Sequence, residues 1–109
     1  MNVEEQIKLA VEALDDAKAK DIEVLDVKGI SNVTDAMIIA TGTSSTHARS
    51  CANKVSVEFK AHELPPIGIE GEDEGQWVLL DLGDVIVHVM QAEAREFYAL
   101  EKLWGGQEA

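Results

Sequence analysis

The stretch QWVLLDLGDVIVHVMQAEAREFYALEKLW, from Gln76 to Trp104, contains the clearest structural signals in this chain. Two apolar runs, at 77–82 and 84–90, flank Gly83, a pattern typical of antiparallel strands joined by a tight turn. A helix is predicted to follow from Glu93 to Trp104, where glycines end it. The stretch therefore predicts a strand pair followed by a helix. It contains either a catalytic site or a surface for another macromolecule.

The residues before this stretch complete a small α/β domain. Apolar spacing predicts helices over about 3–20 and from 43–45 to about 61, and strands at 22–27, 36–40 and 67–69. Thr43, Ser44 or Ser45 can cap the second helix, and the uninterrupted apolar strand at 36–40 belongs inside a covered sheet. The chain is thus predicted to be one domain over residues 1–109, with an ordered core at about 3–104. Its expected order is αββαβββα, a mixed sheet flanked by helices.

The chain is strongly acidic, with 21 Asp and Glu against 9 Lys and Arg and a net charge of −12. Because nucleic acids are bound by neutralising phosphates, we expect no nucleic acid as the main contact. A basic protein is a better electrostatic match, although the charge can also serve solubility alone. No apolar run has the length of a membrane span, the N-terminus has no signal-peptide pattern, and the single Cys51 suits a reducing compartment. A cytoplasmic protein is expected.

Catalytic motifs are weak in this sequence. The Thr41–Ser45 segment could hold a phosphate at a helix N-terminus, but an ordinary helix cap explains it. Asp81 and Asp84 could bind a metal ion. Nucleotidyltransferases of similar strand order place two carboxylates two residues apart on one strand, so that both side chains point the same way. Here the spacing is three and a turn glycine intervenes, so metal catalysis is disfavoured.

The histidines do not complete a catalytic or metal-binding set. His47 and Cys51 are four residues apart and could share a metal ion, but no second pair of ligands accompanies them. His88 interrupts an apolar strand and is expected to be a hydrogen-bonded packing residue rather than a general base. We therefore expect no enzyme activity, no cofactor and no metal.

Aromatic residues favour a binding surface instead. In the last predicted helix Phe97, Leu100 and Trp104 form one apolar stripe, with Tyr98 on one side of it and Leu103 on the other. This apolar arc is wider than one core contact needs, although a well-buried helix is an alternative explanation. Tyr and Trp are enriched at interface hot spots.

Two segments, TDAMIIATGTSS at 34–45 and GIEGEDEGQWVLLDLGDVIVHVMQAEAREFYALEKLW at 68–104, closely resemble the ribosomal silencing factor family, also called iojap-related proteins. The resemblance covers about 7–104. It implies a nucleotidyltransferase-like fold without the catalytic carboxylate pair. It also implies a translational repressor that binds large-subunit ribosomal protein fourteen and sterically blocks joining of the small subunit, in starvation or stationary phase. Members can form homodimers when free.

The resemblance also implies where the partner would bind. The family's interaction surface corresponds here to Trp77, Asp81, Leu82, His88, Tyr98 and Leu103. Trp77, Leu82 and Tyr98 would be apolar anchors, Asp81 would face basic side chains, and His88 would position the strand surface. Arg95 is expected to pair with Glu101 across the last helix. Two rival functions stay open: a ribosome-assembly factor, and a metal-dependent enzyme using Asp81 and Asp84.

Overall fold

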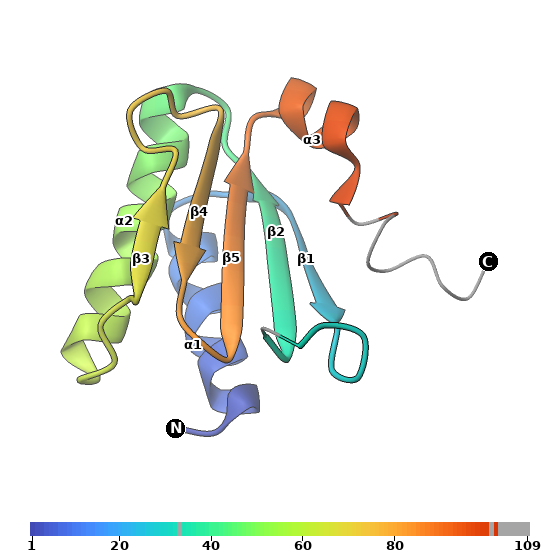
Figure 1. The fold of residues 1–109 in the computed structure, drawn as a ribbon. Helices are drawn as coiled ribbons and strands as arrows, with labels where there is room; N and C mark the ends of the chain where they lie inside the picture. The colour runs from blue at the N-terminus through green and yellow to red at the C-terminus, as the bar shows by residue number, and fades with distance from the viewer. Residues whose placement is uncertain (33, 101, 103–109) are drawn as a thin grey trace.

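The computed structural model describes residues 1–32, 34–100 and 102. The elements follow the predicted order (Figure 1): α1 (Val3–Asp16), β1 (Lys20–Asp26), β2 (Ala36–Thr41), α2 (Ser45–Ala61), β3 (Gly68–Glu70), β4 (Trp77–Asp81), β5 (Val85–Met90) and α3 (Ala92–Tyr98). The α/β class and the mixed sheet flanked by helices are confirmed.

The five strands form one sheet in the order β1-β2-β5-β4-β3. Only the β2–β5 pair is parallel among the described strands, and the other three pairs are antiparallel. β5 lies in the centre, which explains why nearly all of its residues are buried. The predicted β4–β5 pair turns at Gly83, whose φ of +90° is accessible to glycine at little cost.

The two faces of the sheet are covered differently. α1 and α2 lie together on one face (Figure 1) and bury a large cluster that includes Leu14, Ile38, Phe59 and Leu80. On the opposite face a smaller cluster, Leu25, Val27, Met37, Ile39 and Met90, is joined by Trp77, Ala94 and Leu100. We call this second side the open face, because α3 is the one described helix that contacts it and α3 buries none of its own residues.

The segment around Thr41–Ser45 has a structural role. Ser44 caps α2, with its hydroxyl accepting a hydrogen bond from the His47 backbone N–H. The His47 ring accepts from the Thr43 N–H through Nδ1, and its Nε2 donates to the Ala17 carbonyl at 2.8 Å. Burial raises the pKa of the Cys51 thiol, which therefore stays protonated and contacts the same carbonyl. His47 and Cys51 thus join α2 to the end of α1.

The last predicted helix is interrupted at Ala99, and Leu100 and Lys102 are helical again. α3 ends at Tyr98 because Ala99 adopts the left-handed conformation, with φ 48° and ψ 49°. The sequence contains no signal for this break, since alanine is a strong helix former. The turn brings Leu100 against the smaller cluster, while Phe97, expected in the buried stripe, is 80% exposed. The predicted single stripe is therefore wrong for Phe97. Leu103 and Trp104 lie outside the described residues.

Candidate functional site

The open face of β4 and β5 presents a regular set of side chains. Antiparallel pairing places Trp77 opposite Met90, Leu79 opposite His88, and Asp81 opposite Ile86. Side chains alternate between the faces of a strand, so these pairs share the open face while Val78 and Leu80 point into the core under α1 and α2. Trp77, Leu79, Asp81 and Ile86 are partly exposed. The sequence pattern thus builds a half-covered apolar surface.

A hydrogen bond between two ring nitrogens fixes the centre of this surface. The indole Nε1–H of Trp77 donates to His88 Nδ1 at 2.9 Å. The His88 side chain is 5% exposed, and desolvation by burial lowers its pKa from 6.5 to about 4. His88 is consequently neutral at pH 7, and its proton sits on Nε2 because Nδ1 is the acceptor. His88 is thus a buried, hydrogen-bonded residue that orients the Trp77 ring.

Nε2 of His88 is a buried donor without a hydrogen-bond partner in the described part of the chain. An unsatisfied buried polar group costs a protein about 1–3 kcal/mol. The open face therefore keeps a polar group whose burial lowers the stability of the isolated domain.

Two aromatic rings of α3 extend the surface outward. The Tyr98 ring centre lies 4.7 Å from that of Trp77, and the Phe97 ring meets Tyr98 edge-on at 5.0 Å. Tyr98 is 51% exposed and Phe97 80% exposed. We call Trp77, His88, Phe97 and Tyr98 the aromatic cluster. Exposed rings that contact each other in this way are costly to leave in water and are typical of protein-binding sites.

Arg95 holds α3 in place. Its guanidinium donates to the Asp21 carbonyl at 2.6 Å and to the Thr41 hydroxyl at 2.9 Å, and it forms an ion pair with Glu23 at 3.2 Å. The sequence predicted that Arg95 pairs with Glu101, but Glu101 lies outside the described residues. The sequence did not reveal the contacts of Arg95 to β1 and β2, because the residues that form them are more than 50 positions apart. Arg95 thus fixes the helix that presents Phe97 and Tyr98.

Two acidic side chains, Glu93 and Glu96, lie beside the aromatic cluster. A shallow hollow of about 350 Å³ is lined by Gln76, Glu93, Ala94, Phe97 and Tyr98, and Glu96 lies beside Phe97 in a neighbouring hollow. An apolar centre with an acidic rim matches a partner whose surface is apolar and basic.

The remaining predicted site residues do not all lie on the same face of the sheet. Asp81 lies on the open face, and its carboxylate accepts a hydrogen bond from the Gly83 N–H at 2.9 Å. Leu82 packs against the cluster under α1 and α2, so the structure does not bring it together with Trp77 and Tyr98. Leu103 is not among the described residues. The structure therefore assembles Trp77, His88 and Tyr98, with Asp81 further along the same face.

The proposed metal pair does not converge. Asp84 accepts a hydrogen bond from the Gln6 side chain of α1 at 3.2 Å, whereas Asp81 caps the turn on the open face. Among the described residues no three His, Cys, Asp or Glu side chains form a group suited to a metal ion. No described helix has the length and apolarity to cross a bilayer.

Comparison with known proteins identifies relatives over nearly the full chain. The model of a family described as "Ribosomal silencing factor during starvation" matches residues 1–109. The ribosomal silencing factor of Chromobacterium violaceum is 46% identical over 107 residues, which are 98% of this chain and 88% of that protein. The mouse protein named for mitochondrial assembly of the ribosomal large subunit is 36% identical over 101 residues, covering 90% of this chain and 44% of the mouse protein.

Solved structures agree with this relationship. A crystal structure of a Chromobacterium violaceum protein superposes with a TM-score of 0.95 at 46% identity, covering 98% of this chain and 89% of the other. A Bacillus halodurans structure gives 0.84 at 39% identity, covering 93% and 94%.

Proposed function

Because this chain belongs to the ribosomal silencing factor family, we propose that it binds large-subunit ribosomal protein fourteen through the open face and the aromatic cluster. Bound there, it sterically prevents the small subunit from joining. Family membership supports a ribosome-associated regulator of translation. Our proposal adds three points: which residues form the site, which ribosomal protein binds there, and that binding blocks joining of the small subunit.

The exposed pair of Phe97 and Tyr98 carries this proposal. Both rings are at least half exposed on a short helix, and Tyr98 contacts Trp77 at a tilted angle, while His88 orients Trp77. A partner that covers these rings gains their apolar burial without first ordering them. Around this centre an interface of about 800 Å² per partner would be of ordinary size for a specific complex.

Charge supports a protein target rather than ribosomal RNA. The chain carries −12, and Glu93 lies at the rim of the aromatic cluster. Phosphate groups would be repelled, whereas a basic ribosomal protein would be attracted and steered toward the site. Blocking by occupancy needs no cofactor, metal ion or turnover, so the proposal includes no catalysis. It places the protein in the cytoplasm, where it lowers translation in starvation or stationary phase.

Tyr98→Ala tests the site. We predict that it weakens binding to purified large subunits about tenfold or more, because hot-spot truncations cost about 2 kcal/mol or more. Binding is measured by co-sedimentation over a range of protein concentrations. Val57→Ala is the matched control, because Val57 is 49% exposed on α2, away from the open face. Equal affinity of the folded Tyr98→Ala variant and the wild type would exclude Tyr98 from the interface.

A large-subunit assembly role is the second candidate, favoured by the name of the mouse relative. It uses the same subunit but acts on unfinished particles. Deletion of the protein would then leave precursor subunits in the cell, while mature subunits would join normally in its presence.

The open face can also pair two free copies, and concentration-dependent sedimentation tests this proposed homodimer.

A further inference from the structure

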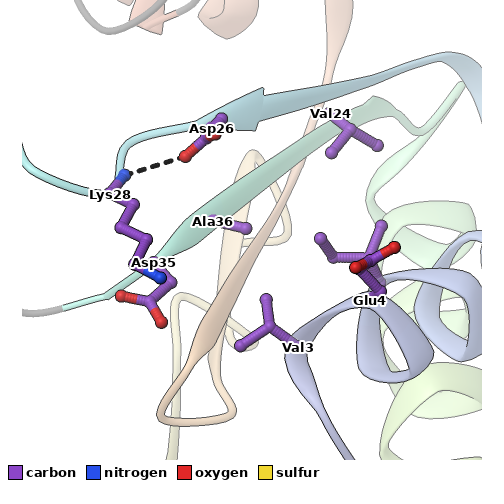
Figure 2. A pocket seen from close by; sticks show the side chains of 8 residues that line it. Val3, Glu4, Val24, Asp26, Lys28, Asp35 and Ala36 are labelled. Carbon is purple, nitrogen blue, oxygen red and sulfur yellow. Dashed lines mark hydrogen bonds between the residues drawn. The ribbon is translucent and has the colours of Figure 1, made fainter.

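A second hollow lies between α1 and the edge of the sheet (Figure 2). It has a volume of about 370 Å³, which is near the lower end of the range for ligand pockets. Val3, Glu4 and Ile7 of α1 line it on one side; Val24, Asp26, Lys28, Asp35 and Ala36 line the other. We call it the α1–β1 groove.

The floor of the α1–β1 groove is apolar and incompletely covered. Val24 stands opposite Ile38 in the β1–β2 register, so its side chain belongs to the face that α1 covers. It is nevertheless 44% exposed, and β1 is an edge strand of the sheet. Val3 and Ile7 are likewise partly buried at the border of the core cluster. The groove thus offers aliphatic surface to a narrow apolar group.

The walls of the groove are acidic. Three carboxylates, Glu4, Asp26 and Asp35, face one cation, Lys28. Asp26 accepts a hydrogen bond from the Lys28 backbone N–H at 3.0 Å. The Lys28 ammonium group takes no part in that hydrogen bond. The ion pairs of the described residues, Lys54–Glu58 and Arg95–Glu23, lie elsewhere. The groove therefore has a surplus of negative charge over an aliphatic floor.

We propose that the α1–β1 groove docks an arginine-bearing segment of a second, basic protein partner. The aliphatic stem of the arginine would lie on Val24 and Ile7, and its guanidinium would meet Asp26 and Asp35. Arginine combines an apolar stem with a fork of donors that suits carboxylates.

This site is independent of the surface proposed for the ribosome. The groove lies where β1 ends and β2 begins, on the helix-covered side. The aromatic cluster lies where β5 ends and α3 follows, on the open face. Figure 1 shows the start of α1 and α3 at opposite ends of the sheet. One copy of the protein can therefore hold both partners at once, so that the groove would recruit a second protein to the first complex.

The test is a titration of the isotope-labelled full chain with the peptide acetyl-Leu-Arg-Leu-amide, followed by backbone amide shifts. We expect saturable shifts confined to the amides of α1, β1 and β2 that line the groove. The double variant Asp26→Asn with Asp35→Asn keeps the side-chain shapes and removes two charges. It should weaken peptide binding at least about fivefold, because each partly exposed ion pair between the arginine and a carboxylate contributes only a modest binding free energy. Asp15→Asn with Asp16→Asn removes the same charge from the far end of α1 and should leave binding unchanged.

Four outcomes would overturn the proposal. One is a titration without saturable shifts at the groove. The second is equal weakening by both double variants, which would indicate general attraction to an acidic chain. The third is equally strong binding of spermidine at the groove, which would indicate a site for small polyamines. Large-subunit binding by the groove variant is expected to stay at the wild-type level. Loss of that binding would place the groove inside the ribosome interface and also refute a separate partner.

Discussion

The buried histidine makes the stability of this domain depend on pH in a defined window. His88 has a pKa of about 4 in the folded protein, against 6.5 when exposed. The unfolded chain therefore binds a proton between these values that the folded chain does not. Stability from this group is complete above pH 6.5 and is lost as the pH falls toward 4.

The size of the effect follows from the two pKa values. Each tenfold difference in proton affinity corresponds to about 1.4 kcal/mol, so the full displacement is worth roughly 3 kcal/mol. Between pH 7 and pH 5 the loss from His88 amounts to about 2 kcal/mol. Protonation would also convert Nδ1 into a donor, which breaks the hydrogen bond from Trp77.

Urea unfolding at pH 7 and pH 5, at constant ionic strength, measures this loss. His88→Gln is the informative variant, because the glutamine oxygen can accept from Trp77 and does not titrate. Exposed His62 supplies the control His62→Gln. The wild type and His62→Gln should lose about 2 kcal/mol more than His88→Gln over this range. If all three proteins lose the same amount, His88 is not buried in its neutral form and the reasoning fails.

Two further substitutions, with one control variant, test how the aromatic cluster is held. Trp77→Phe keeps an aromatic ring but leaves His88 Nδ1 without its donor, so chemical denaturation should show a loss of about 1–3 kcal/mol. Arg95→Met should speed amide hydrogen exchange throughout α3, since its contacts to Asp21 and Thr41 disappear. Glu23→Gln should change exchange little, because the half-exposed ion pair contributes under about 1 kcal/mol. Equal exchange in both variants would show that Arg95 does not hold the helix.

The sequence predicted most of the fold because its signals are local. Hydroxyl residues before α2 predicted a cap, and Ser44 provides it. The alternation from Trp77 to Asp81 about the Gly83 turn predicted the β4–β5 pair. The same alternation places Leu82 on the face opposite Trp77, which strand period alone could have shown.

The parts that could not be predicted depend on contacts distant in sequence. Arg95 donates hydrogen bonds to Asp21 and Thr41, which are 74 and 54 positions away in the sequence. The left-handed Ala99 precedes Leu100, which packs against the smaller cluster, and no glycine or proline stands at this break. The hydrogen bond between Trp77 and His88 joins a diagonal pair on two strands, which requires the register to be known first.

A subunit-joining assay tests whether the protein blocks the association of the two ribosomal subunits. Purified large subunits are incubated with the protein, small subunits are added, and the particles are separated on a sucrose gradient. We expect separate subunits, with the protein on the large one, and restored joining with Tyr98→Ala. Complete joining of the subunits while the wild-type protein remains bound to the large subunit would contradict silencing by steric blocking.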